Sequence, residues 1–309
     1  MRDFPFLTYD VFTETPFGGN PLAVFPDARG IDPAMFQTIA REFNLSETTF
    51  VTPVEGAPLR RRVRIFTPTY ELPFAGHPTV GTAVALAELG AFSWPRFESE
   101  LAITLEEEAG SVPVTLERRP GRALHATLTA PRLPERGPDG PDAAGLARVL
   151  GLAADRLSPT LRPASWSSGV RFCCVPLRDA DALASIALDL SAWRELMAEA
   201  WAKPVYAFAL DDPRRGREIR ARMFAPSLGM AEDPATGAAA VAIAGYLADV
   251  QEVPRDGTAS WTIRQGEEMG RPSRLALEAD FAGGKLMAVR LGGSAVRMTQ
   301  GMLRIGPAE

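Results

Sequence analysis

The spacing of apolar residues along the chain predicts many short strands and few helices. Short runs of β-branched and apolar residues, separated by turn residues, are typical of strands. In the first half such runs lie at residues 7–12, 22–25, 48–51, 61–66, 98–105, 111–117 and 124–129. In the second half they lie at residues 172–175, 205–210, 219–224, 261–265, 273–278, 285–291 and 295–298.

Helical periodicity is confined to a few segments. Asp32 can cap a helix that has Pro33 in its first turn and Ile39 on its apolar face. Residues 142–150 and 190–201 also carry a helical pattern. Mixed strands with few helices favour an α+β fold.

One pattern occurs twice in the chain. Residues 74–86 and 231–243 are each predicted to form a strand end, a sharp turn with proline and an apolar helix. His77 aligns with Asp233 at the turn, and the match extends upstream, where Arg64 aligns with Arg222. Internal repeats set the architecture of a chain, and two copies about half a chain apart predict two related halves that face each other. The Pro- and Gly-rich residues 130–141 are the expected linker.

The composition is that of an ordinary soluble globular protein. The 309 residues suffice for two domains, and 46% of them are apolar and 23% charged. The net charge of −5 gives no basic surface for nucleic acid. No apolar run is long enough to span a membrane, and residues 1–6 lack the apolar core of an export signal. We therefore expect a cytoplasmic protein without nucleic-acid or membrane partners.

Cysteine and histidine are scarce. Cys173 and Cys174 are adjacent in an apolar, strand-like run and cannot form a disulfide framework, so we expect them to be small buried hydrophobic residues. The two histidines are His77 and His125. Because these residues form no cluster with the spacing of metal ligands, no metal is expected.

The two turn-helix segments are candidates for a functional site. The first amides of a helix have no acceptor within the helix, and the helix dipole adds partial positive charge there. Two such ends that converge would bind a carboxylate or a developing enolate. Either turn alone is more simply the start of a core helix. The pair, with ionisable His77 and Asp233 at equivalent positions, favours a functional site.

Other polar segments allow a structural or a functional interpretation. Glu47 lies in a loop before a strand, and such a glutamate is usually a solvated surface charge. The acidic run 106–108 and the basic run 60–62 are most simply solvated faces. The glycine-flanked segment 265–272 either holds Arg271 near a ligand carboxylate or forms a hairpin turn.

Several of these segments together resemble the PhzF family of phenazine-biosynthesis-type isomerases. The matching residues, in the family's order and over the whole chain, are Asn20-Pro21 after a glycine pair, Asn44-Leu-Ser-Glu47, Phe74-Ala-Gly-His-Pro-Thr79, Glu232-Asp-Pro-Ala-Thr-Gly237 and Gln265-Gly-x-x-x-Gly-Arg-Pro272. The resemblance implies the fold of diaminopimelate epimerase. In that fold two pseudo-symmetric domains each wrap a mixed sheet around a central helix, and the active site lies in the cleft between them. The expected domains are residues 1–130 and 142–294, and residues 295–309 are expected to pack back on the first.

The resemblance also implies roles for particular residues. Glu47 matches the family's catalytic acid/base, while His77 and Asp233 match the polar pair that orients the substrate and assists proton transfer. The positions expected to bind substrate are Asn20, Gly76, Pro78, Thr79, Thr236, Gly237, Ala238, Gln265 and Arg271. The implied activity is that of a cofactor-independent isomerase or epimerase that moves a proton on a small carboxylate or amino-acid-like substrate.

Two departures from relatives bear on this expectation. Diaminopimelate epimerase has a cysteine at each turn, where this chain has His77 and Asp233, so racemisation by two cysteines is not expected. The phenazine member of the family has a serine at the position of Ala238, and one hydrogen bond to its substrate is therefore missing here. The open alternatives are a metabolite- or protein-binding protein on the same scaffold, and a lyase or hydratase that uses the same proton abstraction. We expect a small anionic substrate, no cofactor and a two-fold homodimer.

Overall fold

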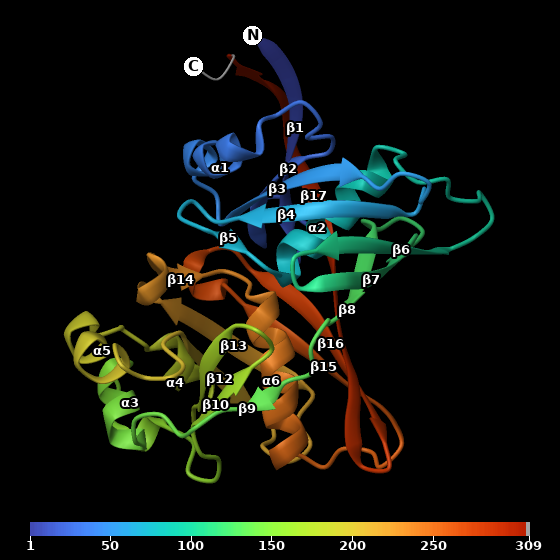
Figure 1. The fold of residues 1–309 in the computed structure, drawn as a ribbon. Helices are drawn as coiled ribbons and strands as arrows, with labels where there is room; N and C mark the ends of the chain where they lie inside the picture. The colour runs from blue at the N-terminus through green and yellow to red at the C-terminus, as the bar shows by residue number, and fades with distance from the viewer. Residues whose placement is uncertain (307–309) are drawn as a thin grey trace. The chain divides into compact units, whose positions relative to one another are not determined.

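The computed structural model describes residues 1–306, and the chain divides into two compact units (Figure 1). Of the described residues, unit 1 contains 1–131 and 292–306, and unit 2 contains Arg132–Leu291. One strand, β17 (Lys285–Ile305), begins in unit 2 and ends in unit 1. The sequence predicts two strands here. The structure has a single strand, in which a Cβ at Gly292 or Gly293 would clash with His125 or Phe12.

The strands of unit 1 form a ring around one helix, α2 (Gly76–Glu88). Neighbouring strands pair in the order given below, and β17 pairs with both β8 and β1, which closes the ring. The short strand β5 (Glu71–Leu72) pairs with β4 beside β6. The ring strands are β1 (Arg2–Val11), β2 (Asn20–Phe25), β3 (Glu47–Pro53), β4 (Arg60–Phe66), β6 (Glu100–Glu107), β7 (Gly110–Glu117), β8 (His125–Thr129) and the C-terminal part of β17.

Helix α2 is buried from Gly76 to Leu86 because small and apolar side chains surround it on every side. A helix that is apolar all round belongs in a core. The glycine at position 81 lets the ring close on it, since a Cβ there would lie 2.6 Å from side-chain atoms of both Leu22 and Val11. The hydroxyl of Thr82 is satisfied by that of Thr49, 2.9 Å away.

Outside the ring of unit 1, an aromatic cluster fills the space beneath α1 (Phe36–Phe43). The ring of Phe36 stacks on Phe50 at 4.0 Å, and Phe50 stacks on Phe25 at 5.0 Å. The preceding turn, η1 (Pro33–Met35), is capped by Asp32 as the sequence predicts. This layer fixes the strands that carry Glu47 and its neighbours.

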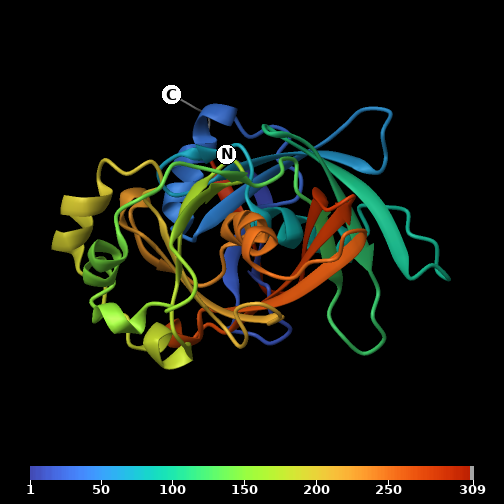
Figure 2. The same cartoon turned by 90° about the horizontal axis from the view of Figure 1, so that it is seen from below.

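Unit 2 repeats the pairing of unit 1. Pairs β11–β12 and β13–β15 are parallel, like β2–β3 and β4–β6, whereas β12–β13, β13–β14 and β15–β16 are antiparallel, like β3–β4, β4–β5 and β6–β7. The central helix α6 (Gly237–Val250) corresponds to α2, and Figure 2 shows it end-on with strands around it. The strands are β9 (Glu135–Arg136), β10 (Ala164–Ser167), β11 (Arg171–Pro176), β12 (Val205–Leu210), β13 (Glu218–Ala225), β14 (Met230–Asp233), β15 (Gly257–Gln265) and β16 (Ser273–Ala282).

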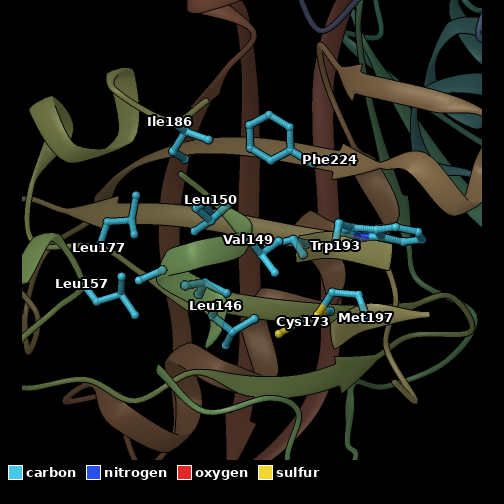
Figure 3. Close-up of a cluster of buried hydrophobic side chains, with 14 of the residues drawn as sticks. Leu146, Val149, Leu150, Leu157, Cys173, Leu177, Ile186, Trp193, Met197 and Phe224 are labelled. Atoms are coloured by element: carbon cyan, nitrogen blue, oxygen red, sulfur yellow. The ribbon is translucent and has the colours of Figure 1, made fainter. Parts of the chain in front are cut away.

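Helices on the outside of unit 2 bury a second apolar cluster against β11 and β12 (Figure 3). They are α3 (Ala143–Val149), α4 (Ala180–Ala184) and α5 (Leu190–Met197), with the turn η2 (Ala154–Arg156). Cys173 lies in this cluster and Cys174 is also buried, as predicted. Within residues 1–306, no helix has the length and apolarity to cross a membrane.

The segment expected as a linker, residues 130–141, contains the boundary between the two units, at Pro131 and Arg132. It also contains β9, where Arg136 pairs with Trp166 of β10. One expectation about unit 2 needs correction: helix α5 ends at Met197 instead of residue 201, with the N–H of Ala200 donating back to the Met197 carbonyl in a turn. The chain also forms α4, a single short turn of helix that the Asp179 side chain caps and that the sequence does not predict.

Both units hold the strand before the central helix with an Arg–Glu pair. Arg64 on β4 binds Glu71 on β5 through two hydrogen bonds of 2.6 and 2.7 Å. Arg222 on β13 binds Glu232 on β14 through two bonds of 2.8 Å. The two halves therefore share both the aligned arginine and the ion pair that it forms.

We expect Gly81→Ala to lower the free energy of unfolding by about 1–3 kcal/mol, because the added methyl group overpacks a filled core. Gly145→Ala in α3 is the matched control, since its methyl would meet its nearest neighbours at 3.1 and 3.3 Å. The higher helix propensity of alanine should keep that variant within about 1 kcal/mol of the wild type. Urea denaturation measures both, and an unchanged midpoint for Gly81→Ala would contradict the close packing of α2.

The two Arg–Glu pairs should differ in energy because they differ in burial. The Arg222 and Glu232 side chains are 10% and 15% exposed, whereas those of Arg64 and Glu71 are 37% and 28% exposed. Glu232→Gln should cost about 3 kcal/mol, since it leaves a buried guanidinium incompletely neutralised. Glu71→Gln should cost less than about 1 kcal/mol. Equal costs in chemical denaturation would show that burial does not separate the two pairs.

Candidate active site

The residues predicted for the site fall into two groups, one in each unit. The Glu47 group, in unit 1, consists of Asn20, Glu47, Gly76, His77, Pro78 and Thr79. The Asp233 group, in unit 2, consists of Asp233, Thr236, Gly237, Ala238, Gln265 and Arg271. Each group gathers around the N-terminus of the central helix of its unit.

Glu47 is the first residue of β3 and is buried, although a loop glutamate is usually solvated. It is buried because β3 pairs in parallel with β2, which places Glu47 opposite Leu22 inside the ring of unit 1. Its Oε2 lies 2.8 Å from Nε2 of His77. The two side chains are 9% and 5% exposed, so a carboxyl and an imidazole meet almost without solvent.

The contact between Glu47 and His77 is close but is not a hydrogen bond. Both atoms satisfy the distance of an ion pair, yet neither has a hydrogen-bond partner with suitable geometry among the described residues. A buried polar atom without a hydrogen bond is rare in a native structure, and ligand binding is one explanation. The pair therefore has unused hydrogen-bonding capacity.

Helix α2 begins at this pair without a side-chain cap. Its N-cap is Ala75, and the first turn contains no acidic residue that would neutralise the helix dipole. Thr79, predicted to bind substrate, has its hydroxyl 2.7 Å from the Ala75 carbonyl, inside the turn. Asn20 is fully buried at the start of β2, opposite Val11.

The structure adds Tyr70 to the surroundings of Glu47. Burial raises the pKa of the Tyr70 phenol above its usual value of 10, and the negative charge of Glu47 raises it further. Tyr70 lies in the turn after β4, where its backbone N–H donates to the Thr67 hydroxyl. The sequence does not predict this role, because nothing in the local pattern distinguishes Tyr70 from any other turn residue.

Glu107 was also missed, because the acidic run 106–108 was interpreted as a solvated face. The middle residue is in fact buried, with Glu106 half-buried and Glu108 exposed on either side. Strand alternation explains the difference, since every second side chain of β6 points into the ring. Its Oε1 lies 2.6 Å from the Thr79 hydroxyl on α2.

In unit 2, hydrogen bonds tie the Asp233 group together. The carboxylate of Asp233 accepts a bond of 2.6 Å from the Thr236 hydroxyl. The side-chain amide of Gln265 donates to the Asp233 carbonyl at 2.8 Å and to the Thr236 hydroxyl at 3.0 Å. All three side chains are buried. The turn before α6 is therefore bound to the end of β15 through Gln265 and to the end of β14 through Asp233.

The segment 265–272 is a hairpin connection between β15 and β16, and Arg271 lies in this connection. Gly266 has φ +78°, and a Cβ there would lie 2.6 Å from the Pro234 carbonyl oxygen. Only glycine lets this loop pack on the Asp233 turn. The backbone N–H of Arg271 closes the loop on the Gly266 carbonyl at 3.0 Å.

Helix α6 also lacks a side-chain cap. Thr236 is its N-cap, but its hydroxyl binds Asp233 and leaves the helix end uncapped. Gly237 begins the helix and the Ala238 methyl is 9% exposed beside this end. Two uncapped helix N-termini of this kind can each bind an anionic group.

A buried carboxyl beside an imidazole can take up and return a proton, and uncapped helix amides can stabilise the negative charge that develops. Among residues 1–306, no group of three or more His, Cys, Asp or Glu side chains is placed to hold a metal ion.

Known proteins resemble the chain over nearly its full length. The family model described as "Phenazine biosynthesis-like protein" matches residues 9–301. The chain is 43% identical to an uncharacterized isomerase of Mesorhizobium japonicum, covering 99% of this chain and all of the relative. It is 36% identical to the trans-2,3-dihydro-3-hydroxyanthranilate isomerase of Pseudomonas aeruginosa, covering 96% and 98% of the two chains.

A solved structure agrees with these relatives. The PhzF family protein of Bacillus anthracis superimposes with a TM-score of 0.86 at 27% sequence identity, covering 99% of this chain and all of the other. The fold predicted from the resemblance, mixed sheets around central helices in two pseudo-symmetric halves, is confirmed. Sequence and fold thus lead to one conclusion: the chain belongs to the PhzF family of phenazine-biosynthesis-like isomerases.

Proposed function

We propose that this protein moves a proton between two carbons of a small anionic substrate, with Glu47 as the acid/base and without a cofactor. The observation that carries the proposal is the 2.8 Å contact between the buried Glu47 and His77 side chains. The Glu47 and His77 side chains are almost fully buried, so the substrate would meet them in water-poor surroundings. Glu47 removes a proton from one carbon and returns it to another.

His77 and Asp233 assist this transfer in the proposal. The imidazole of His77 orients the Glu47 carboxyl and can hold a proton while the substrate carries negative charge. Asp233, which Thr236 and Gln265 hold in place, orients a polar group of the substrate. The uncapped ends of α2 and α6 can each bind an anionic group.

The remaining predicted positions have supporting roles in this proposal. Gly76, Pro78 and Gly237 present backbone rather than side chains to the ligand. Thr79 and Thr236 act through the turns that their hydroxyls stabilise. Asn20 and Arg271 are proposed to bind polar groups of the substrate. The expected two-fold homodimer stays a prediction.

Glu47→Gln should lower substrate proton exchange by about 100- to 10,000-fold, because the amide cannot accept the proton. The protein would be incubated in deuterated water with a panel of small carboxylates and amino acids. The substrate named for the Pseudomonas aeruginosa relative, trans-2,3-dihydro-3-hydroxyanthranilate, would be the first compound tested. Deuterium incorporation and product mass, followed by NMR and mass spectrometry, separate isomerisation from loss of a group.

Glu55→Gln is the matched control, since it removes an exposed carboxylate from the loop after β3. It should leave exchange unchanged. If Glu47→Gln retained full exchange on a turned-over compound, the acid/base role would be wrong. If a compound bound without any exchange, the protein would be a binding protein on this scaffold.

Ala238 offers a test of the substrate. Ala238→Ser should restore a hydroxyl beside the α6 N-terminus, where the phenazine member of the family has a serine. A hydrogen bond of about 1 kcal/mol would raise kcat/KM for trans-2,3-dihydro-3-hydroxyanthranilate by roughly 5-fold. A fall in kcat/KM for this compound would indicate that the alanine suits a different substrate. Ala244→Ser, buried further along α6, serves as a control for the added hydroxyl.

A further inference from the structure

Glu107 is a buried acid that the proposed proton transfer does not use. It is the last residue of β6, and its side chain lies inside the ring of unit 1. One carboxyl oxygen contacts the Thr79 hydroxyl at 2.6 Å, and the other has no hydrogen-bond partner among the described residues. An ionised carboxylate would be costly here, because a single hydroxyl cannot replace its hydration.

The hydrogen bonds of Thr79 indicate that Glu107 is protonated. The Thr79 hydroxyl has one proton, and the Ala75 carbonyl 2.7 Å away can only accept, so the hydroxyl donates there. The same hydroxyl lies 2.6 Å from Glu107 Oε1, and its single proton cannot serve both acceptors fully. A protonated Glu107 supplies the second proton for this contact. Burial is the main cause that raises the pKa of Glu107 to about 8, so the carboxyl is mostly neutral at pH 7.

The turn that follows Glu107 binds the chain on the N-terminal side of His77. Residues 107–110 join β6 to β7, and Glu107 is in register with Gly110. The N–H of Ala109 donates to the Pro73 carbonyl at 2.8 Å. Contacts from this one hairpin therefore hold the chain just before Gly76 and just after Pro78, with His77 between them.

Few other charges bear on this arrangement. Neighbouring Glu106 points the other way and pairs with Arg60, and no charged side chain of the described residues contributes to the pKa of Glu107. His77 faces Glu47 on β3. Burial and the Glu47 charge both raise the pKa of the Tyr70 phenol.

We propose that protonated Glu107 is a positioning residue of the candidate site, which holds the first turn of α2 and with it the His77 imidazole, and releases that turn when it ionises. It acts through Thr79 and the Ala75 carbonyl and does not touch the substrate. The role of the positioned imidazole rests on the proposed function. The coupling between Glu107 and His77 does not, and it can be measured without any substrate.

The two histidines of the chain make this coupling directly observable. The ring Cε1–H signals of His77 and His125 can be followed by NMR from pH 6.5 to 9.5, with His125→Gln to assign them. In the wild type, the His77 signal should show an inflection near pH 8, where Glu107 ionises. Glu107→Gln, whose amide still donates to Thr79, should lose that inflection. Glu108→Gln, the exposed neighbour, should retain it.

Thermal unfolding provides a second measurement. Because the pKa of Glu107 is raised in the folded state, the folded protein binds a proton that the unfolded chain has lost between pH 4.5 and about 8. Stability from this group is present at low pH and is lost as the pH rises through that window. The Tm of the wild type should therefore fall relative to Glu107→Gln from pH 6 to 9.

The outcomes separate this inference from the proposed function. If the His77 inflection is absent, or persists in Glu107→Gln, the positioning role is wrong even when turnover depends on Glu47. If Glu107→Gln does not fold, Thr79→Val replaces it, since it keeps the acid but removes the bridge, and it should also lose the inflection. If the inflection depends on Glu107 but no compound exchanges protons, the proposed function fails and this inference stands.

Discussion

The burial of two helices made of small and apolar residues is the constraint on which the rest of this structure depends. Residues 76–86 of α2 and 237–247 of α6 are buried, so neither helix presents a polar face to solvent there. Only residues as small as Gly81 and Gly245 let strands and side chains approach that closely, as their contacts with Val11 and Trp166 show. The N-terminus is then the part of each helix with unsatisfied amides, and the candidate site groups lie there.

The two halves share their pairing but not their chemistry. The aligned Phe66 and Phe224 stand opposite Thr48 and Val205, so the strand position of Glu47 corresponds to Pro204 in unit 2. The acid therefore occurs in one half only. At the turns, His77 and Asp233 occupy equivalent positions but have different partners: His77 contacts an acid, whereas Asp233 binds a hydroxyl and lies beside an amide. One scaffold thus supplies two different sets of groups.

Polar groups are buried in both units, and most are satisfied by local bonds. Thr236 and Gln265 form hydrogen bonds to Asp233. The Arg222 guanidinium, besides binding Glu232, donates to the Leu183 and Ile186 carbonyls. In unit 1, by contrast, Glu47 Oε2, His77 Nε2 and Glu107 Oε2 are buried without a hydrogen-bond partner among the described residues. Such groups are costly to bury, and their concentration around one helix end fits a functional site.

Local patterns in the chain were enough to predict most strands, the cap at Asp32, the buried cysteines and the repeat that relates α2 to α6. These features depend on alternation, capping chemistry and small-residue spacing, which act over a few residues. Motifs resembling the PhzF family singled out Glu47, His77 and Asp233. The burial of Glu107 and Glu47, the position of Tyr70, the strand β9 and the continuous β17 depend on which strands pair and in what register. Those pairings join segments far apart in the chain, so only the folded structure could decide them.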